Sequence, residues 1–117
     1  MPSMINYQAG DLVLVDFPFT VSGPGKPRPA LVILDAGDDD LLLARVTTQT
    51  RITAFDFEIP GWRQAGLLAP STVRLHKLAT LAKSRVHRRL GTLDLSDRQQ
   101  IGLALRQIAA TFESSQS

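Results

Sequence analysis

Short apolar runs, separated by Gly, Pro and Asp residues, follow one another through most of the chain and predict strands rather than helices. The runs at 12–17 and 30–35 carry apolar residues at both odd and even positions. The run at 41–48 begins in the same way, but Arg45 and Thr47 make one of its faces polar towards its end. Because a strand that is apolar on both faces is buried on both, these runs predict a sheet covered on each side.

Clean alternation of apolar and polar residues marks two further strands, at 55–59 and 72–76, and another extended stretch is expected at 78–86. In the segment 72–76, Arg74 and His76 share the polar face, opposite the apolar residues. The second half of the chain therefore continues the sheet, and one of its strands presents a cation and an imidazole together.

A single helix is predicted near the C-terminus. Ser96 with Gln99 three residues later forms a capping-box pattern, and Asp97 lies in the first turn, where the helix dipole favours an acid. Apolar residues at helical spacing then run to about Phe112. About five strands followed by a helix predict a mainly β fold with α additions, a β-barrel or strongly bent sheet capped by the C-terminal helix.

Length and composition narrow the class of protein. With 117 residues, 44% of them hydrophobic and 21% charged, we expect one globular domain over 1–117, with a core from about 10 to 113. The absence of Cys excludes disulfides, Cys-ligated zinc, iron–sulfur clusters and thiol nucleophiles. No apolar run is long enough for a membrane span, and no Lys or Arg precedes Lys26, so we expect a cytoplasmic protein without a membrane segment or signal peptide.

Charge is unevenly distributed, although the formal net charge is only +2. No acid occurs between Ile59 and Leu93, and this window holds the basic residues Arg63, Arg74, Lys77, Lys83, Arg85, Arg88 and Arg89 with His76 and His87. A segment so one-sided suggests an anionic partner, a nucleic acid or an acidic peptide. The alternative is a solvated face whose cations pair with acids from elsewhere in the chain, and charge alone does not decide.

Familiar metal and nucleotide motifs are missing, so neither a metal nor a cofactor is expected. The two His residues have no acid near them in the sequence and make a poor metal site. What remains is a cationic, polar set: Arg28 at the end of the Pro/Gly-rich segment 18–29, Thr47, and Arg74 with His76. Residues two apart on one strand face lie about 7 Å from each other, a suitable span for the two sides of a phosphodiester.

These residues lie in segments that resemble the MazF/PemK toxin family, in the family's order and at its spacing. The segments are 10–17 (GDLVLVDF), the Pro/Gly loop with 28–33 (RPALVI), 46–49 (VTTQ), 71–81 (STVRLHKLATL), and 90–93 (LGTL) followed by a helix. The resemblance runs from about Gly10 to Ala110. It implies an SH3-like plasmid-maintenance-toxin barrel with a C-terminal helix, assembled as a homodimer.

The same resemblance implies a function. Members of the family are toxins of type II toxin–antitoxin systems that cleave single-stranded RNA at short sequences without a metal. The 2′-OH of the RNA attacks, which leaves a 2′,3′-cyclic phosphate and a 5′-OH. A cognate antitoxin inhibits them by covering the active site, and contact with DNA is expected only indirectly, through the antitoxin complex.

Arg28, Thr47 and Arg74 match the family's catalytic positions. Arg28 is expected to stabilise charge on the non-bridging oxygens, and Thr47 to donate a hydrogen bond to the phosphate. Arg74 either binds a phosphate or pairs with an acid such as Asp16. His76 stands where many relatives have an Asp. Its unperturbed pKa of about 6.5 suits a general base, but a lone His is often structural, so the identity of the base stays open.

Further residues are expected to contact RNA. Phe19 can stack on an unpaired base. The others can contribute charge or hydrogen bonds, and they are Thr20, Ser22, Lys26, Gln49, Lys77, Arg85, His87, Arg88 and Arg89. Two other functions remain open, a non-catalytic toxin of the same barrel fold that poisons a protein such as gyrase, and an inactive SH3-like nucleic-acid-binding module. The set Arg28, Thr47 and Arg74 favours the nuclease, because poisoning gyrase would require no such cluster.

Overall fold

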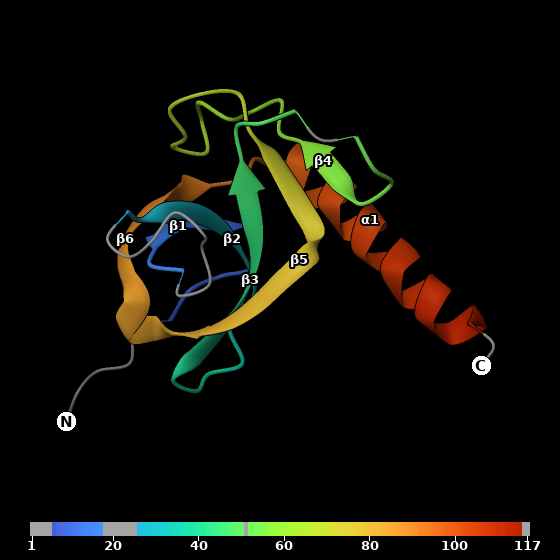
Figure 1. The fold of residues 1–117 in the computed structure, drawn as a ribbon, viewed down its shortest axis with the longest axis horizontal. Coiled ribbons are helices and arrows are strands. Elements are labelled where there is room, and N and C mark those ends of the chain that lie inside the picture. The colour runs from blue at the N-terminus through green and yellow to red at the C-terminus, as the bar shows by residue number, and fades with distance from the viewer. Residues whose placement is uncertain (1–5, 18–25, 51, 116–117) are drawn as a thin grey trace.

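In the described part of the chain, six antiparallel strands form one curled sheet in the order β4-β5-β3-β2-β1-β6, followed by a C-terminal helix (Figure 1). The computed structural model describes residues 6–17, 26–50 and 52–115. The elements are β1 Asp11–Val15, β2 Arg28–Leu34, β3 Asp40–Thr47, β4 Asp56–Glu58, β5 Thr72–Ala82, the 3₁₀ turn η1 Lys83–Arg85, β6 Val86–Thr92 and α1 Leu95–Ser114. The mainly β class is confirmed. The sheet has β4 and β6 at its two edges, so the barrel-like curl is not closed.

Strand β5 is longer than the alternation predicted, and it bends sharply (Figure 1). The stretch expected at 78–86 is not a separate strand, because its first part continues β5 and its end lies in η1 and β6. The register pairs Arg45 with Arg74 but Ala44 with Leu78, so residues 75–77 form a bulge that bends the strand. Strand β6 was missed because its sequence, VHRRLGT, shows no apolar alternation.

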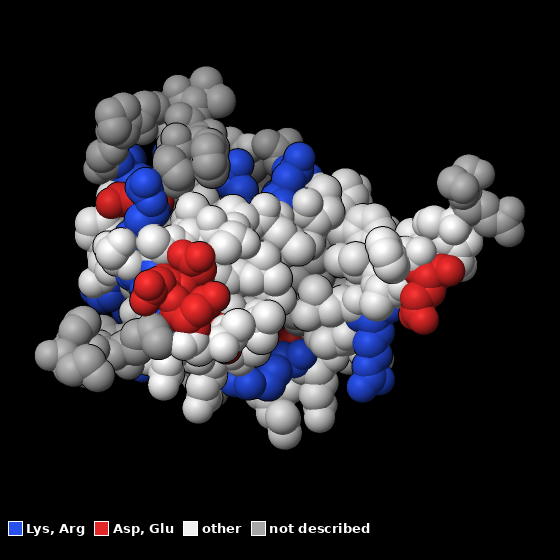
Figure 2. Space-filling view, turned by 90° about the horizontal axis from the view of Figure 1, so that it is seen from below, with Lys and Arg blue, Asp and Glu red and all other residues white. Residues whose placement is uncertain are grey.

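The turn between β2 and β3 lies at the bottom of Figure 1 and carries exposed acids. Asp38, Asp39 and Asp40 are all exposed there, and Figure 2, which views this end, shows acidic atoms gathered in one patch. Below the surface, Asp35 pairs with Lys83 of η1 at 3.0 Å. This ion pair ties the turn to the segment that joins β5 and β6.

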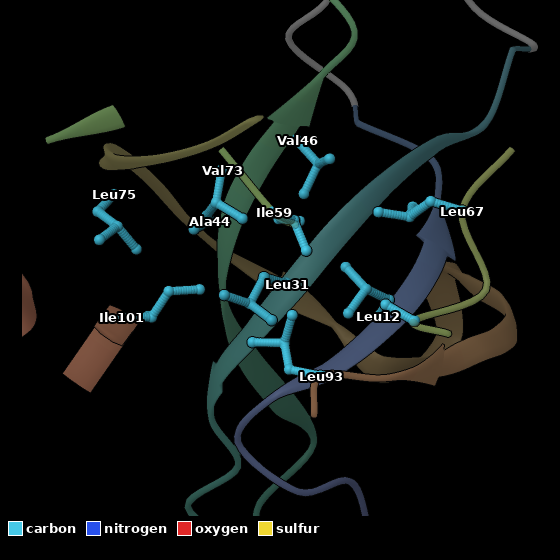
Figure 3. Close-up of a cluster of buried hydrophobic side chains, with 11 residues drawn as sticks. Leu12, Leu31, Ala44, Val46, Ile59, Leu67, Val73, Leu75, Leu93 and Ile101 are labelled. Atoms are coloured by element: carbon cyan, nitrogen blue, oxygen red, sulfur yellow. The ribbon is translucent and has the colours of Figure 1, made fainter. Parts of the chain in front are cut away.

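The sheet is apolar on both faces, as predicted, and each face has its own core. The first core contains Leu12, Leu31, Ala44, Val46, Ile59, Ala65, Leu67, Val73, Leu75, Leu93 and Ile101 (Figure 3). The second core contains Val13, Val15, Phe17, Ala30, Val32, Leu41, Leu43 and Leu81. Strands β1, β2 and β3 contribute alternate residues to the two cores, which explains why their sequences are apolar at odd and even positions alike.

Helix α1 is capped by Asp94, whose side chain accepts a hydrogen bond from the backbone N of Asp97 at 2.8 Å. The predicted cap Ser96 is wrong, because Asp94 still has extended backbone and Ser96 already lies in the first turn. Asp97 is in the first turn, as expected, but its side chain also accepts from the backbone N of Gly61 at 3.0 Å. No helix among the described residues is long and apolar enough to cross a membrane.

The loop 60–71 crosses β6 at two glycines. A Cβ placed on Gly91 would overlap the carbonyl oxygen of Ala65, and one placed on Gly66 would overlap that of Leu90. Gly66 also has a φ of +86°, which other residues rarely adopt. These glycines allow the loop to lie directly against β6 while Ala65 and Leu67 enter the first core.

Candidate functional site

The structure brings Arg28, Thr47 and Arg74 to one face of the sheet, where β2 begins, β3 ends and β5 begins. Ala30 is the partner of Arg45 on β3, and Arg45 is in turn the partner of Arg74 on β5. Arg28 precedes Ala30 by two residues and Thr47 follows Arg45 by two, so the antiparallel register carries both toward the same point. This point lies at the upper end of β3 in Figure 1.

This face of β3 changes from apolar to polar along the strand. Leu41 and Leu43 are buried in the second core, whereas Arg45 is exposed and Thr47 is half-buried. The site therefore lies at the rim of the second core, with apolar packing beneath it and solvent above.

Arg74 is held by two neighbours. Its Nε donates to Asp56 Oδ1 at 2.9 Å, and its Nη2 lies 3.3 Å from His76 Nε2. The Arg74 side chain is 20% exposed and that of Asp56 only 2%. The predicted choice between a phosphate and an acidic partner is thus partly answered, since Arg74 has an acidic partner, but it is Asp56 and not Asp16.

The pKa of Asp56 lies below its ordinary value. Burial alone would raise it, but hydrogen bonds from Arg74 and from Thr53, together with the positive charge of Arg74, outweigh that effect. Thr53 contributes both its backbone N, at 3.1 Å, and its hydroxyl, at 2.9 Å. Asp56 is therefore an anion that fixes Arg74 across the β4–β5 pair.

His76 lies in the bulge of β5, exposed to solvent. Because a guanidinium has no acceptor, Arg74 Nη2 is the donor in its contact with His76 Nε2, and Nε2 accepts in the tautomer that carries its proton on Nδ1. The ring of Phe55 lies 6.0 Å from the imidazole, tilted by 51°. His76 thus lies beside both the guanidinium of Arg74 and the ring of Phe55.

Thr47 retains a hydroxyl proton for a ligand. Its Oγ1 accepts a hydrogen bond from the backbone N of Gln49 at 3.1 Å, which orients the oxygen and leaves the O–H to donate elsewhere. Gln49 itself is exposed beyond the end of β3, and Lys26 is exposed just before β2. These two predicted RNA contacts lie beside the predicted catalytic residues along the chain.

Other predicted RNA contacts lie in the bulge of β5, in η1 and on β6. His87 pairs with Asp16 at 3.0 Å, an acid that is distant from it in the sequence, and Arg89 pairs with Asp11 at 3.1 Å. Lys77, Arg85 and Arg88 are exposed. Phe19, Thr20 and Ser22 lie outside the described residues. The roles of these residues toward RNA stay predictions.

Sequence reasoning missed two residues of the site, Asp56 and Arg45. Asp56 was recognised only as an outward residue of an alternating strand, and its pairing with Arg74 depends on the β4–β5 register. Arg45 was recognised as polar, but only the β3–β5 register shows that it is the partner of Arg74. No group of three or more His, Asp or Glu side chains that could hold a metal ion occurs among the residues described.

Comparisons with known proteins show the family and the fold of the chain. Residues 8–109 match the family model described as PemK-like, MazF-like toxin of type II toxin-antitoxin system. An endoribonuclease in complex with its cognate antitoxin, from Mycobacterial species, is similar with a TM-score of 0.71 and 17% identity, over 96% of this chain and 100% of that chain. The Mycobacterium tuberculosis toxin MazF-mt6 is similar with a TM-score of 0.68 and 22% identity, over 91% and 99%.

A third similar structure is the MazE–MazF complex from Deinococcus radiodurans, with a TM-score of 0.69 and 21% identity over 89% of this chain and 96% of that chain. At such identities the likeness to solved structures shows the fold. No curated protein sequence matches the chain.

Proposed function

Because the chain belongs to the family of PemK-like, MazF-like toxins of type II toxin–antitoxin systems, we propose that it is an endoribonuclease that cleaves single-stranded RNA without a metal ion. The observation that carries the proposal is the meeting of guanidinium, imidazole and hydroxyl groups where β2 and β5 begin and β3 ends. Arg74 and His76 are 3.3 Å apart there, and Arg28 and Thr47 lie on the same face as Arg74.

In the proposed reaction the 2′-OH of the RNA attacks the adjacent phosphorus, and the bond from phosphorus to the 5′ oxygen breaks. Negative charge grows on the non-bridging oxygens, which Arg28 and Arg74 bind and to which Thr47 donates. When Arg74 turns its Nη2 from His76 to the phosphate, His76 Nε2 becomes free to take the 2′-OH proton. The departing 5′ oxygen takes a proton from water, so the products are a 2′,3′-cyclic phosphate and a 5′-OH.

The partners follow from the same family. Similar structures contain an antitoxin, and we propose that such a protein binds this chain over the candidate site, at the ends of β2, β3 and β5. Contact with DNA would then occur only through the antitoxin complex.

We also propose a homodimer. Sedimentation at micromolar concentration should give the mass of two chains, and a monomer at that concentration would overturn this assignment.

The decisive experiment is cleavage of total RNA by the purified protein in the presence of EDTA, followed by mapping of the cut ends. We expect cleavage to survive chelation and to leave 5′-OH ends. An oligonucleotide with a 2′-deoxy sugar at the cut nucleotide should bind but stay intact, because the attacking group is missing. Cleavage that requires added magnesium, or that leaves 5′-phosphates, would contradict the mechanism.

A matched pair of variants ties the activity to the site. Arg28→Ala should lose at least about 10²-fold in cleavage rate, as expected when a group that stabilises transition-state charge is removed. Arg106→Ala removes an exposed Arg from α1 and should keep the wild-type rate. RNA binding without any cleavage would instead support the inactive nucleic-acid-binding module.

A further inference from the structure

Arg45 and Arg74 stand directly opposite each other on β3 and β5. Directly opposed residues on neighbouring strands have Cβ atoms about 5 Å apart and project from the same face of the sheet. Two like charges in this arrangement destabilise a sheet unless something neutralises them. Such a pair within the candidate site therefore indicates a place for an anion.

The two arginines differ in their partners. Arg74 is neutralised by Asp56, with Nε and Oδ1 2.9 Å apart. Arg45 is exposed, and among the described residues it forms no ion pair; its guanidinium carbon lies 5.6 Å from the centre of the Phe17 ring. An aromatic face orients a guanidinium without satisfying its N–H donors. Arg45 is thus pre-oriented beside the site, with its hydrogen-bonding capacity available.

The position of Arg45 along β3 fixes what it can reach. It lies two residues before Thr47 on the same strand face, about 7 Å away, which is close to the spacing of successive phosphates in an extended nucleic-acid strand. Arg28, Thr47 and Arg74 already surround one phosphate in the proposed function. Arg45 lies one such step from Thr47 along β3 and directly beside Arg74, so it is placed for the phosphate next to the one at Thr47, on the Arg74 side.

We propose that Arg45 is a substrate-positioning residue that binds an RNA phosphate adjacent to the scissile one, and that it sets the register of the RNA strand along β3. The proposal rests on the function proposed above, because it takes single-stranded RNA as the ligand. The Phe17 ring, 5.6 Å from the guanidinium carbon, restricts the orientations of the Arg45 side chain, and a planar guanidinium can offer two parallel N–H groups to a phosphate.

The test is the binding of a non-cleavable RNA oligonucleotide, 2′-deoxy at the cut nucleotide, measured by fluorescence anisotropy over a series of KCl concentrations. Loss of one phosphate contact from a single strand should reduce the slope of log K against log salt by about 0.7. For Arg45→Ala we expect this reduction and roughly a tenfold weaker affinity. Arg45→Lys should retain the salt slope and recover part of the affinity, because the charge remains while the planar, stacked geometry is lost.

The control is Arg106→Ala, which removes the same charge from the exposed face of α1 and should leave the slope unchanged. An unchanged slope for Arg45→Ala, or the same loss in both variants, would overturn the role of Arg45. A wild-type protein that fails to bind the oligonucleotide would overturn it as well. Cleavage of native RNA by the wild-type protein is measured separately, so a protein that binds but does not cleave overturns only the proposed function.

Thermal unfolding at low salt provides a second, independent readout. Arg45→Gln relieves the repulsion between Arg45 and Arg74, so its melting temperature should be equal to that of the wild type or higher. A lower melting temperature would show that Arg45 supports the fold, and the assignment to substrate positioning would be wrong.

Discussion

Arg74 illustrates how two neighbours of different chemistry can hold one side chain for a reaction. Asp56 binds Nε, and His76 meets Nη2 from the other side. A guanidinium is planar, so two fixed nitrogens determine the orientation of the whole group. The Asp56 carboxylate is buried, whereas His76 is exposed, so in the proposed reaction it is the His76 contact that is exchanged for a phosphate.

Replacing Asp56 by Asn should remove a pH-dependent part of the stability. The pKa of Asp56 is lower in the folded protein than in the unfolded chain, so the carboxylate stabilises the fold above about pH 4, and this contribution disappears as the pH falls through the folded value. At pH 7 the variant should be less stable by about 1–3 kcal/mol. Urea unfolding at several pH values measures this difference.

The difference between wild type and Asp56→Asn should shrink at acidic pH, where both side chains are neutral. Glu58→Gln, an exposed carboxylate on the same strand, serves as the control and should change stability little. A stability difference that stays constant down to the most acidic pH tested would mean that the ion pair is not its source.

The role of His76 can be read from the pH dependence of the cleavage rate. A general base must be neutral, so the rate should rise with pH as the base loses its proton. His76→Ala should lose about 10²- to 10⁴-fold in rate with little change in RNA affinity. His76→Asp should shift the rising limb to lower pH, because a carboxyl titrates there.

His87 offers the matched control for His76, because it is the other histidine of the chain and pairs with Asp16 on the far side of β1. His87→Ala should leave the midpoint of the rising limb in place. If His76→Ala keeps the wild-type rate and profile, His76 is a bystander, and Arg28 with Thr47 must carry the reaction.

At the scale of elements, the fold depends on the close approach of two backbone segments, the loop 60–71 and β6. Gly91→Ala should destabilise the protein by about 1–3 kcal/mol, because the new methyl group overlaps the carbonyl oxygen of Ala65 where the loop 60–71 crosses β6. The same substitution at Gly102 should act in the opposite direction. No atom lies within 4 Å of a Cβ added there, and Ala is favoured over Gly inside a helix by about 1 kcal/mol.

Chemical denaturation of the two alanine variants compares these outcomes directly. Equal stability of Gly91→Ala and the wild type would show that the crossing can relax. A destabilised Gly102→Ala would show that α1 is packed more closely at that position than the structure indicates.

Strands β1, β2 and β3 were predictable because burial on both faces leaves a continuous apolar signal, and their ends were found to within about two residues. Strand β6 was not predictable from its own sequence, which is polar. It is held in the sheet by its pairing with β1. The helix was predicted but its cap was misplaced, because Ser96 and Asp94 are both good caps and only the end of β6 selects Asp94.

The candidate site was predictable only in part. Arg28, Thr47 and Arg74 could be identified from local motifs, whereas the pairs Asp56–Arg74 and Arg45–Arg74 arise from strand register. Register is set by which strands meet and by the bulges between them, and neither is a local property of the sequence.

At the scale of the whole molecule, opposite charges lie at opposite ends of β3. Asp40, with Asp38 and Asp39, lies at its start in the acidic patch of Figure 2, and Thr47 ends it beside the arginines of the site. Eight residues of extended strand separate these ends by about 25 Å. An approaching polyanion is repelled at one end and attracted at the other, which directs it toward the site.

Neutralising the acidic patch with Asp38→Asn, Asp39→Asn and Asp40→Asn together should raise the rate of RNA association at low salt, because a repulsive region is removed. The effect should vanish at high salt, where charges farther apart than a Debye length are screened. Stopped-flow fluorescence measures the rates. A changed cut position would contradict this account, since the patch lies far from the site, and Glu113→Gln on α1 serves as the single-charge control.

The bulge at 75–77 lets β5 keep two independent alignments with β3. Beyond the bulge, Leu78 to Ala82 pair with the first half of β3, which is anchored in the second core; before it, Thr72 to Arg74 pair with the second half, which bears the site. Beyond the buried Leu75, an insertion falls where no ladder with β3 exists, so neither alignment has to slip. The bulge therefore joins a half of β5 that packs on the second core to a half that bears Arg74, and the two halves can shift relative to each other without a change of register.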